Sequence, residues 1–150
     1  MYEDLEVNNY VVKWSKWVPS KCSIFMWRSE MNKLPTLDAL KRRNILIDSS
    51  TCSLCETADE TVKHFIIGCE VANAVWSFVA SRCKKYALQG IIIVASWSIW
   101  KARNEMIFRQ KEVKIEEIIV NIRSFSFLSF KNRSKCKSIS WTEWCSFSLM

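Results

Sequence analysis

The chain's only histidine lies among three of its seven cysteines, in the segment TCSLCETADETVKHFIIGC. The spacing is Cys52-x₂-Cys55-x₈-His64-x₄-Cys69. A Cys-x-x-Cys pair places two thiolates on a tight turn, at the separation that a tetrahedral metal ion needs. A histidine and a cysteine five positions apart complete such a shell from a helical turn or from an irregular loop. The spacing therefore predicts a zinc ion held by Cys52, Cys55, His64 and Cys69.

The predicted site is structural and not catalytic. Zn²⁺ accepts three sulfurs and one nitrogen, and four protein ligands leave no open position for a water molecule. Because the single histidine is committed to the metal, no Ser/His/Asp or Cys/His pair is left for nucleophilic catalysis. With two glycines in the whole chain there is no glycine-rich phosphate loop. We therefore predict no catalytic residues, no enzyme activity and no small-molecule substrate.

Three other interpretations of these cysteines stay open at this point. Cys52 and Cys55 would suit a redox pair, but no βαβ pattern surrounds them. A disulfide is disfavoured because an odd number of cysteines without a secretory signal is typical of a reducing compartment. The third interpretation is that the cysteines are unrelated small residues of the hydrophobic core. The remaining thiols have no partner spacing and are interpreted as core or incidental: Cys22, Cys83, Cys136 and Cys145.

Acidic residues surround the predicted site at Glu56, Asp59 and Glu60. Carboxylates near a metal can orient its ligands through hydrogen bonds. We interpret these three acidic residues instead as solvated surface residues.

The rest of the composition indicates helices. Apolar residues make up 49% of the 150 residues, which suffices for a hydrophobic core, and two Gly and two Pro are too few for a turn-rich β fold. We predict an all-α domain of about five helices, with the irregular zinc-binding loop between the second and the third. Helical spacing of apolar residues predicts helices in 19–33, 36–44, 70–87, 91–110 and 114–130.

The helical spacing also predicts which residues face the core. In the first helix Ile24, Trp27 and Met31 recur at helical spacing, with Phe25 beside them, and in the second Leu37 and Leu40 should point inward. In 91–110 the aromatic and aliphatic residues Trp97, Trp100, Ile107 and Phe108 should be available for burial, and Lys101, Arg103 and Arg109 exposed. The last stretch, 131–150, has no clear period and is expected to be frayed.

The net charge of +7 comes from outside the cysteine and histidine segment and would attract a polyanionic partner, and the alternative is a basic surface with no specific partner. We expect RNA or single-stranded DNA, contacted by two basic clusters: Lys41, Arg42, Arg43 and Arg82, Lys84, Lys85. For the first cluster, compensation of a helix dipole is the alternative. The apolar run ALQGIIIVASWSIW is shorter than the ~20 residues of a membrane span. No signal peptide is visible, so an intracellular protein is expected, in the nucleus or cytoplasm and not secreted.

Several motifs together resemble a known family. They are WSKWVPSKCSIFMWR, LPTLDALKRRNI, CSLC with DETVKHFIIGCEVANAVW, and WSIWKARNEMIF. The chain resembles the zinc-binding domain near the C-terminal end of plant LINE-type (non-LTR) reverse transcriptase polyproteins, over roughly residues 14–110. The resemblance implies a zinc module that lies between polymerase and ribonuclease H parts and helps to hold template or RNA. No Tyr-x-Asp-Asp motif and no set of four spaced carboxylates is present, so we expect a module detached from those parts.

These observations predict three regions and a function. Residues 1–13 form a ragged lead-in, 14–110 the zinc-binding domain with its following helix, and 111–150 a C-terminal helix with a frayed tail. The predicted function is a non-catalytic structural-zinc module that binds nucleic acid through basic surfaces. The alternative is a protein-interaction or structural scaffold, or a decayed retroelement fragment, in which Trp141 and Trp144 form an adhesive surface. The sequence predicts no oligomeric state.

Overall fold

The computed structural model of the chain describes residues 14–82 and 85–146. Within these residues helices are connected by loops, and the only β pairing is one isolated bridge. The predicted all-α fold is therefore confirmed, and the loop that carries the cysteines and the histidine lies between α2 and α3, as predicted. In chain order the helices are α1 (Ser20–Glu30), α2 (Leu37–Arg42), η1 (His64–Gly68), α3 (Glu70–Arg82), α4 (Lys85–Arg109), α5 (Ile115–Arg133) and α6 (Trp141–Cys145).

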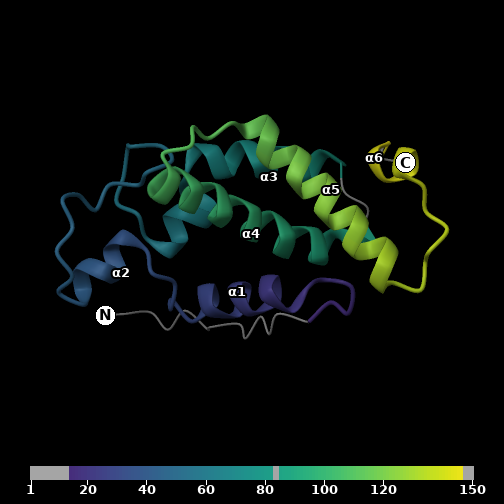
Figure 1. The fold of residues 1–150 in the computed structure, drawn as a ribbon, viewed down its shortest axis with the longest axis horizontal. Coiled ribbons are helices and arrows are strands. Elements are labelled where there is room, and N and C mark those ends of the chain that lie inside the picture. The colour runs from purple at the N-terminus through teal and green to yellow at the C-terminus, as the bar shows by residue number, and fades with distance from the viewer. Residues whose placement is uncertain (1–13, 83–84, 147–150) are drawn as a thin grey trace, which may run out of the picture.

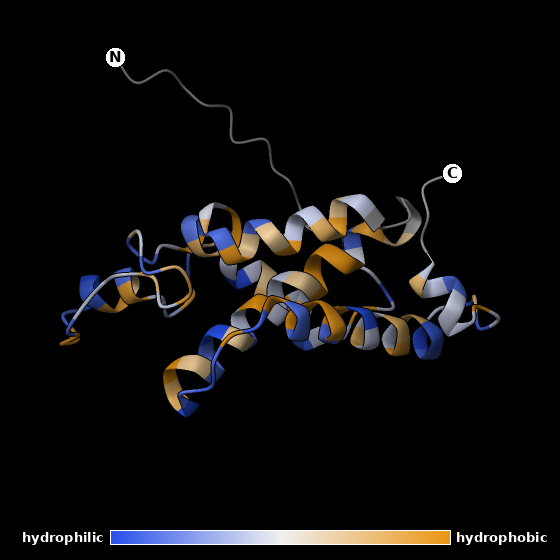
Figure 2. Ribbon diagram, turned by 90° about the horizontal axis from the view of Figure 1, so that it is seen from above, coloured by the Kyte–Doolittle hydropathy of each residue, from blue (hydrophilic) through white to orange (hydrophobic). Residues whose placement is uncertain are grey.

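Helix α4 runs through the middle of the bundle, with α1 on one side and α3 and α5 on the other (Figure 1). Its hydrophobic stretch lies at the centre of the molecule, between helices of mixed polarity (Figure 2). Ile91, Val94 and Ile99 on this stretch are at most 3% exposed. Helix α2 and the cysteine-containing loop lie at one end of the bundle, and α6 lies at the other (Figure 1). No helix in the described part of the chain is both long enough and apolar enough to cross a membrane.

Helix α4 begins at Lys85, six residues before the predicted start, and continues through Gly90. A glycine normally weakens a helix interior by about 1 kcal/mol relative to alanine. Here it makes room for a neighbour, because an added Cβ would lie 2.1 Å from Cζ2 of Trp17. Trp17 is 7% exposed and is thereby packed directly against the backbone of α4. This close packing of the Trp17 ring explains why position 90 is a glycine despite its cost to the helix.

We expect Gly90→Ala to destabilise the fold by about 1–3 kcal/mol, the usual cost of overpacking, despite its better helix propensity. Urea denaturation followed by circular dichroism measures the change. In a Trp17→Leu background the same substitution should cost much less, because the clashing ring is gone. An equal loss in both backgrounds would show that contact with Trp17 is not the reason for the glycine.

The apolar residues that recur at helical spacing in α1 are not the ones that face the core. Ile24, Trp27 and Met31 are 45–48% exposed, whereas Cys22 and Phe25 are buried. The Phe25 ring contacts two aromatic rings of α4, those of Trp97 and Trp100, at centroid distances of 5.6 and 5.8 Å. The buried face also includes Ser23 and Ser29, so small residues let α1 approach α4 closely. Apolar residues occur on two faces of this helix, and spacing alone did not distinguish them.

The prediction of a frayed C-terminal tail is wrong for the described residues up to 146. Ser140 and Glu143 form a capping box, in which each side chain accepts a hydrogen bond from the other residue's backbone N–H, and helix α6 follows. Trp144 is 2% exposed, and its ring lies 5.1 Å from that of Phe130. Trp144 is therefore part of the core and not of an adhesive surface, whereas Trp141 remains 45% exposed.

Other single-residue predictions had mixed outcomes. Lys101 and Arg109 are exposed, as predicted. Phe108 is 76% exposed, although burial was predicted, because it lies on the outer side of the last turn of α4. Cys22 is a core residue and Cys136 is exposed, in agreement with their interpretation as core or incidental thiols, whereas Cys83 lies outside the described residues.

Candidate metal centre

The structure brings together the four side chains that the spacing singled out. The ligand atoms of Cys52, Cys55, His64 and Cys69 all lie within 4.8 Å of one another. Cys55 Sγ and His64 Nε2 are 3.2 Å apart. A zinc ion about 2.3 Å from each sulfur would set the corners of its tetrahedron about 3.8 Å apart. The observed cluster fits such an ion after shifts of about 1 Å or less in its ligand atoms.

The first two ligands lie on a short hairpin-like turn. Cys52 donates its backbone N–H to the carbonyl of Ala58 at 2.7 Å, and a β-bridge joins Thr51 to Asp59. Inside this turn the N–H of Glu56 donates to the carbonyl of Cys52 at 2.8 Å. Glu56 itself adopts a positive φ of 56°, which lets the chain reverse within four residues of the first cysteine. Backbone hydrogen bonds thus place both thiols of the Cys-x-x-Cys pair on one side.

The other two ligands are joined by one turn of π-helix, η1. The N–H of Cys69 donates to the carbonyl of His64 at 2.7 Å, a bond between residues five apart. The Thr61 hydroxyl accepts the His64 N–H at 3.0 Å and so fixes the start of the turn. The x₄ spacing between His64 and Cys69 is therefore the length of one wide turn, and such turns are frequent at functional sites. The sequence left helical and irregular geometry open, and the structure shows the helical one.

Burial separates the thiols into two kinds. Cys52 and Cys69 are fully buried, whereas Cys55 is half-buried. Burial raises the pKa of Cys52 to about 12 and also raises the pKa of Cys69. For Cys55 burial also raises the pKa, but hydrogen bonds from Thr57, His64 and Cys52 outweigh it and the pKa falls to about 6. The buried thiols therefore need the charge of a metal ion to lose their protons at neutral pH.

Helix α3 begins directly after Cys69, so this sulfur sits at a helix N-terminus. Backbone hydrogen bonds from Val71 and Ala72 act to lower the pKa of Cys69, against the larger effect of burial. Helix N-termini favour negative charge, so the fold assists a thiolate at this position. Trp76, about two turns further along, donates its indole N–H to the carbonyl of Ile66 at 2.6 Å and holds α3 against η1.

Glu60 was expected to be solvated and is instead completely buried. Its carboxylate receives hydrogen bonds from the guanidinium of Arg103, one of them from Nε at 3.1 Å, and from the backbone N–H of Leu37 at 3.1 Å. Arg103, predicted to be exposed, is 3% exposed and lies over the Trp100 ring at 4.8 Å. The two residues are 43 positions apart, so no local pattern reveals the pair. It joins the metal-binding loop to α2 and α4.

Phe65, next to His64, is fully buried, and its ring lies 5.3 Å from that of Trp100. The metal-binding loop thus contributes to the same core as the helices. Among the basic candidates, Lys41, Arg42 and Arg43 are exposed around the end of α2, and Arg42 pairs with Asp38 at 3.1 Å. For Arg82, Lys84 and Lys85 the side chains lie outside the described part of the structure.

A Cys₃His cluster closed by four side chains, in a loop attached to a helical bundle, defines a structural zinc-binding module. The family described as zinc-binding in reverse transcriptase matches residues 2–76, half of the chain, and the match includes all four ligands. The chain belongs to this family, as the sequence resemblance predicted, and carries its structural zinc site. The matched family describes zinc binding and not polymerase chemistry. No curated protein and no solved structure matches the chain.

The family match ends at Trp76, before helix α4. Arg103 on α4 nevertheless neutralises the buried Glu60 of the matched segment. Helix α4 therefore stabilises the zinc module from outside the matched range. The predicted region boundaries at 13/14 and 110/111 stay predictions.

Proposed function

We propose that this chain is a non-catalytic zinc module, of the kind found in plant LINE-type retrotransposons, that binds RNA or single-stranded DNA through exposed basic side chains. The observation that carries this proposal is the cationic cluster of Lys41, Arg42 and Arg43 beside the metal-binding loop. All three are exposed, and neither Lys41 nor Arg43 has an ion-pair partner among the described residues. Unpaired cations on a basic protein are available to phosphates.

An apolar tip follows this cluster. Leu46 is 99% exposed and Ile45 is 48% exposed, in the loop between α2 and the zinc ligands. Nucleic-acid-binding proteins combine cations for the phosphates with apolar or aromatic side chains for the bases. A zinc ion bound at Cys52 would hold the far end of this loop. Its proposed role is to keep the cationic cluster and the apolar tip in one place.

A non-catalytic role follows from the donor set. Three sulfurs and the chain's only imidazole occupy the four positions of the shell, so no position is left to activate a water molecule. We therefore infer that the ion stabilises the fold and takes no part in a reaction.

Fluorescence anisotropy with labelled single-stranded RNA at about 50 mM salt tests the proposal, since low salt favours counterion release. Lys41→Gln/Arg43→Gln should weaken binding and lower the salt slope by about 0.7 for each lost phosphate contact. The charge-matched control is Lys135→Gln/Lys137→Gln, at exposed positions between α5 and α6. No binding by the unaltered chain, or an equal loss in both variants, would contradict the proposed surface.

A protein-interaction scaffold is the second candidate, and an apolar groove of about 970 Å³ favours it. Val62, Ile66, Ile67 and Trp76 are among its lining residues, and Ile67 is 61% exposed. Grooves of this kind accept an apolar helix face, here from a second copy of the chain. Light scattering during size exclusion tests it: a dimer that Ile67→Glu dissociates would support the scaffold, and a clean monomer would count against it.

A further inference from the structure

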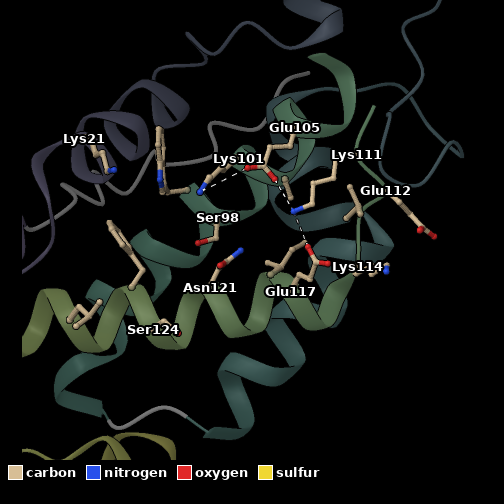
Figure 3. A pocket seen from close by; sticks show the side chains of 16 residues that line it. Lys21, Ser98, Lys101, Glu105, Lys111, Glu112, Lys114, Glu117, Asn121 and Ser124 are labelled. Carbon is tan, nitrogen blue, oxygen red and sulfur yellow. Dashed lines mark hydrogen bonds and ion pairs between the residues drawn. The ribbon is translucent and has the colours of Figure 1, made fainter. Parts of the chain in front are cut away.

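A cavity of about 400 Å³ lies between α1, α4 and α5 and is closed on one side by the loop after α4 (Figure 3). Its walls carry two aromatic rings, Trp97 and Phe125, and four lysines, Lys21, Lys101, Lys111 and Lys114. A second cavity of about 510 Å³ shares Lys21, Phe125 and Leu128 with the first and extends along α5 to Arg133. The two cavities are neighbours that have these three side chains in common, and we call them together the lysine groove.

One lysine lies over both aromatic rings of the lysine groove. The ammonium group of Lys21 lies 5.7 Å from the centroid of the Trp97 ring and 5.2 Å from that of Phe125. An aromatic ring face attracts a cation at this distance, so Lys21 is the side chain that lies over both rings in the structure. A flat aromatic ligand can therefore reach the same faces once the flexible, exposed Lys21 side chain moves aside.

The other end of the groove carries an exchangeable network of charges. Lys111 Nζ lies 2.9 Å from a carboxylate oxygen of Glu117 and 3.5 Å from one of Glu105, and Lys101 lies 4.0 Å from Glu105 (Figure 3). The side chains of Lys101 and Lys111 are 58% and 51% exposed. Exposed ion pairs contribute little to stability, so a phosphate oxygen can replace a glutamate at small cost.

The charge balance favours an anion. Four lysines face three glutamates in the first cavity, and Arg133 adds a further positive charge in the second. Lys101 is two residues before Arg103, which holds the zinc loop, so this cationic end lies toward the zinc-bearing end of the bundle (Figure 1). Ser98, Ser124 and Asn121 also line the first cavity and add hydroxyl and amide groups to it.

We propose that the lysine groove binds single-stranded nucleic acid, with a base stacked on Phe125, beside Trp97, and the adjoining phosphates on Lys101, Lys111 and Lys114. This inference rests on the proposed nucleic-acid-binding function and adds a second, base-stacking contact to the cluster on α2. Unpaired bases expose the faces that such stacking requires, whereas a duplex hides them. A volume of about 400 Å³ suits one nucleotide and not a folded partner.

The test uses a labelled RNA of about 12 nucleotides and an abasic strand of the same length, because stacking acts only on the first. Phe125→Leu keeps an apolar side chain and removes the ring, so RNA binding should weaken about ten-fold while binding of the abasic strand is unchanged. Lys101→Gln/Lys114→Gln should weaken binding of both strands and lower the salt slope by about 1.4. Circular dichroism confirms that each variant is folded.

The outcomes distinguish this inference from the proposed function. If Phe125→Leu leaves RNA binding unchanged while Lys41→Gln/Arg43→Gln weakens it, the groove is overturned and the proposed function stands. If the unaltered chain binds no RNA, both fail. A groove variant that loses polyglutamate binding but not RNA binding would show an acidic peptide site instead.

A second measurement needs no variant. Photocrosslinking of the unaltered chain to RNA containing 5-bromouridine should attach nucleotides to the peptides that contain Trp97 or Phe125. Crosslinks confined to the α2 peptide would overturn the groove.

Discussion

Removal of zinc from the folded chain by a chelator is expected to unfold the loop between α2 and α3 and to destabilise the helices packed on it. Structural zinc contributes about 10–16 kcal/mol of apparent binding free energy in small sites, and a whole domain has a stability of about 5–15 kcal/mol. The loop also carries Phe65, which packs on Trp100 in the centre of the bundle. Loss of the loop therefore exposes core residues of α4 to water.

Thermal unfolding followed by circular dichroism, with and without chelator, measures this effect. The unfolding temperature should fall markedly on chelation and return when zinc is added. Acid should act in the same direction, because protons compete with zinc for the thiolates. A chelated chain with unchanged helicity and unchanged unfolding temperature would show that the fold does not depend on the metal.

The second large effect is expected at the buried ion pair of Glu60 and Arg103. Removal of either partner leaves an uncompensated charge at a position that is at most 3% exposed, which costs about 3–5 kcal/mol. Arg103→Met should therefore destabilise the chain strongly, and so should Glu60→Leu, which also removes the acceptor for the Leu37 N–H. Urea denaturation measures both changes.

Two comparisons make this prediction specific. Arg42→Gln breaks an ion pair whose side chains are 55% and 36% exposed, so it should cost less than about 1 kcal/mol. The double variant Glu60→Leu/Arg103→Met removes both charges, and it should be more stable than either single variant. If the single variants cost no more than Arg42→Gln, the buried pair does not hold the zinc loop against α4.

The zinc ligands were predictable from the sequence because their chemistry is local. Cys52 and Cys55 lie within one turn of chain, and His64 and Cys69 within another, so spacing along the chain translates directly into distance. The helices were predictable because apolar periodicity repeats within each segment. The all-α fold and the loop between the second and third helices follow from these two patterns.

The Glu60–Arg103 pair was not predictable because it depends on how distant segments pack. An acidic residue beside a surface loop and an arginine on a helix are both usually solvated. Only the approach of α4 to the zinc loop places them together, across 43 residues of chain. The sequence around Glu60 therefore does not reveal that its partner lies on α4.

The buried face of α1 was not predictable for a different reason. Both the exposed face, with Ile24 and Trp27, and the buried face, with Cys22 and Phe25, contain apolar residues at helical spacing. The choice between them depends on the partner surface of α4, where Trp97 and Trp100 receive Phe25. Shape complementarity with a second element decides burial here, and hydrophobicity alone does not.

Metal analysis of the purified chain beside its Cys55→Ser variant tests the zinc site most directly. Cys55 is the half-buried thiol of the cluster, so this substitution removes a ligand with little loss of packing, and Cys136→Ser at an exposed position is the matched control. We predict one zinc ion per chain in the unaltered protein and in Cys136→Ser, with a marked loss of zinc and of thermal stability in Cys55→Ser. A folded chain that contains no zinc, or a Cys55→Ser variant that retains both its metal and its stability, would contradict the account.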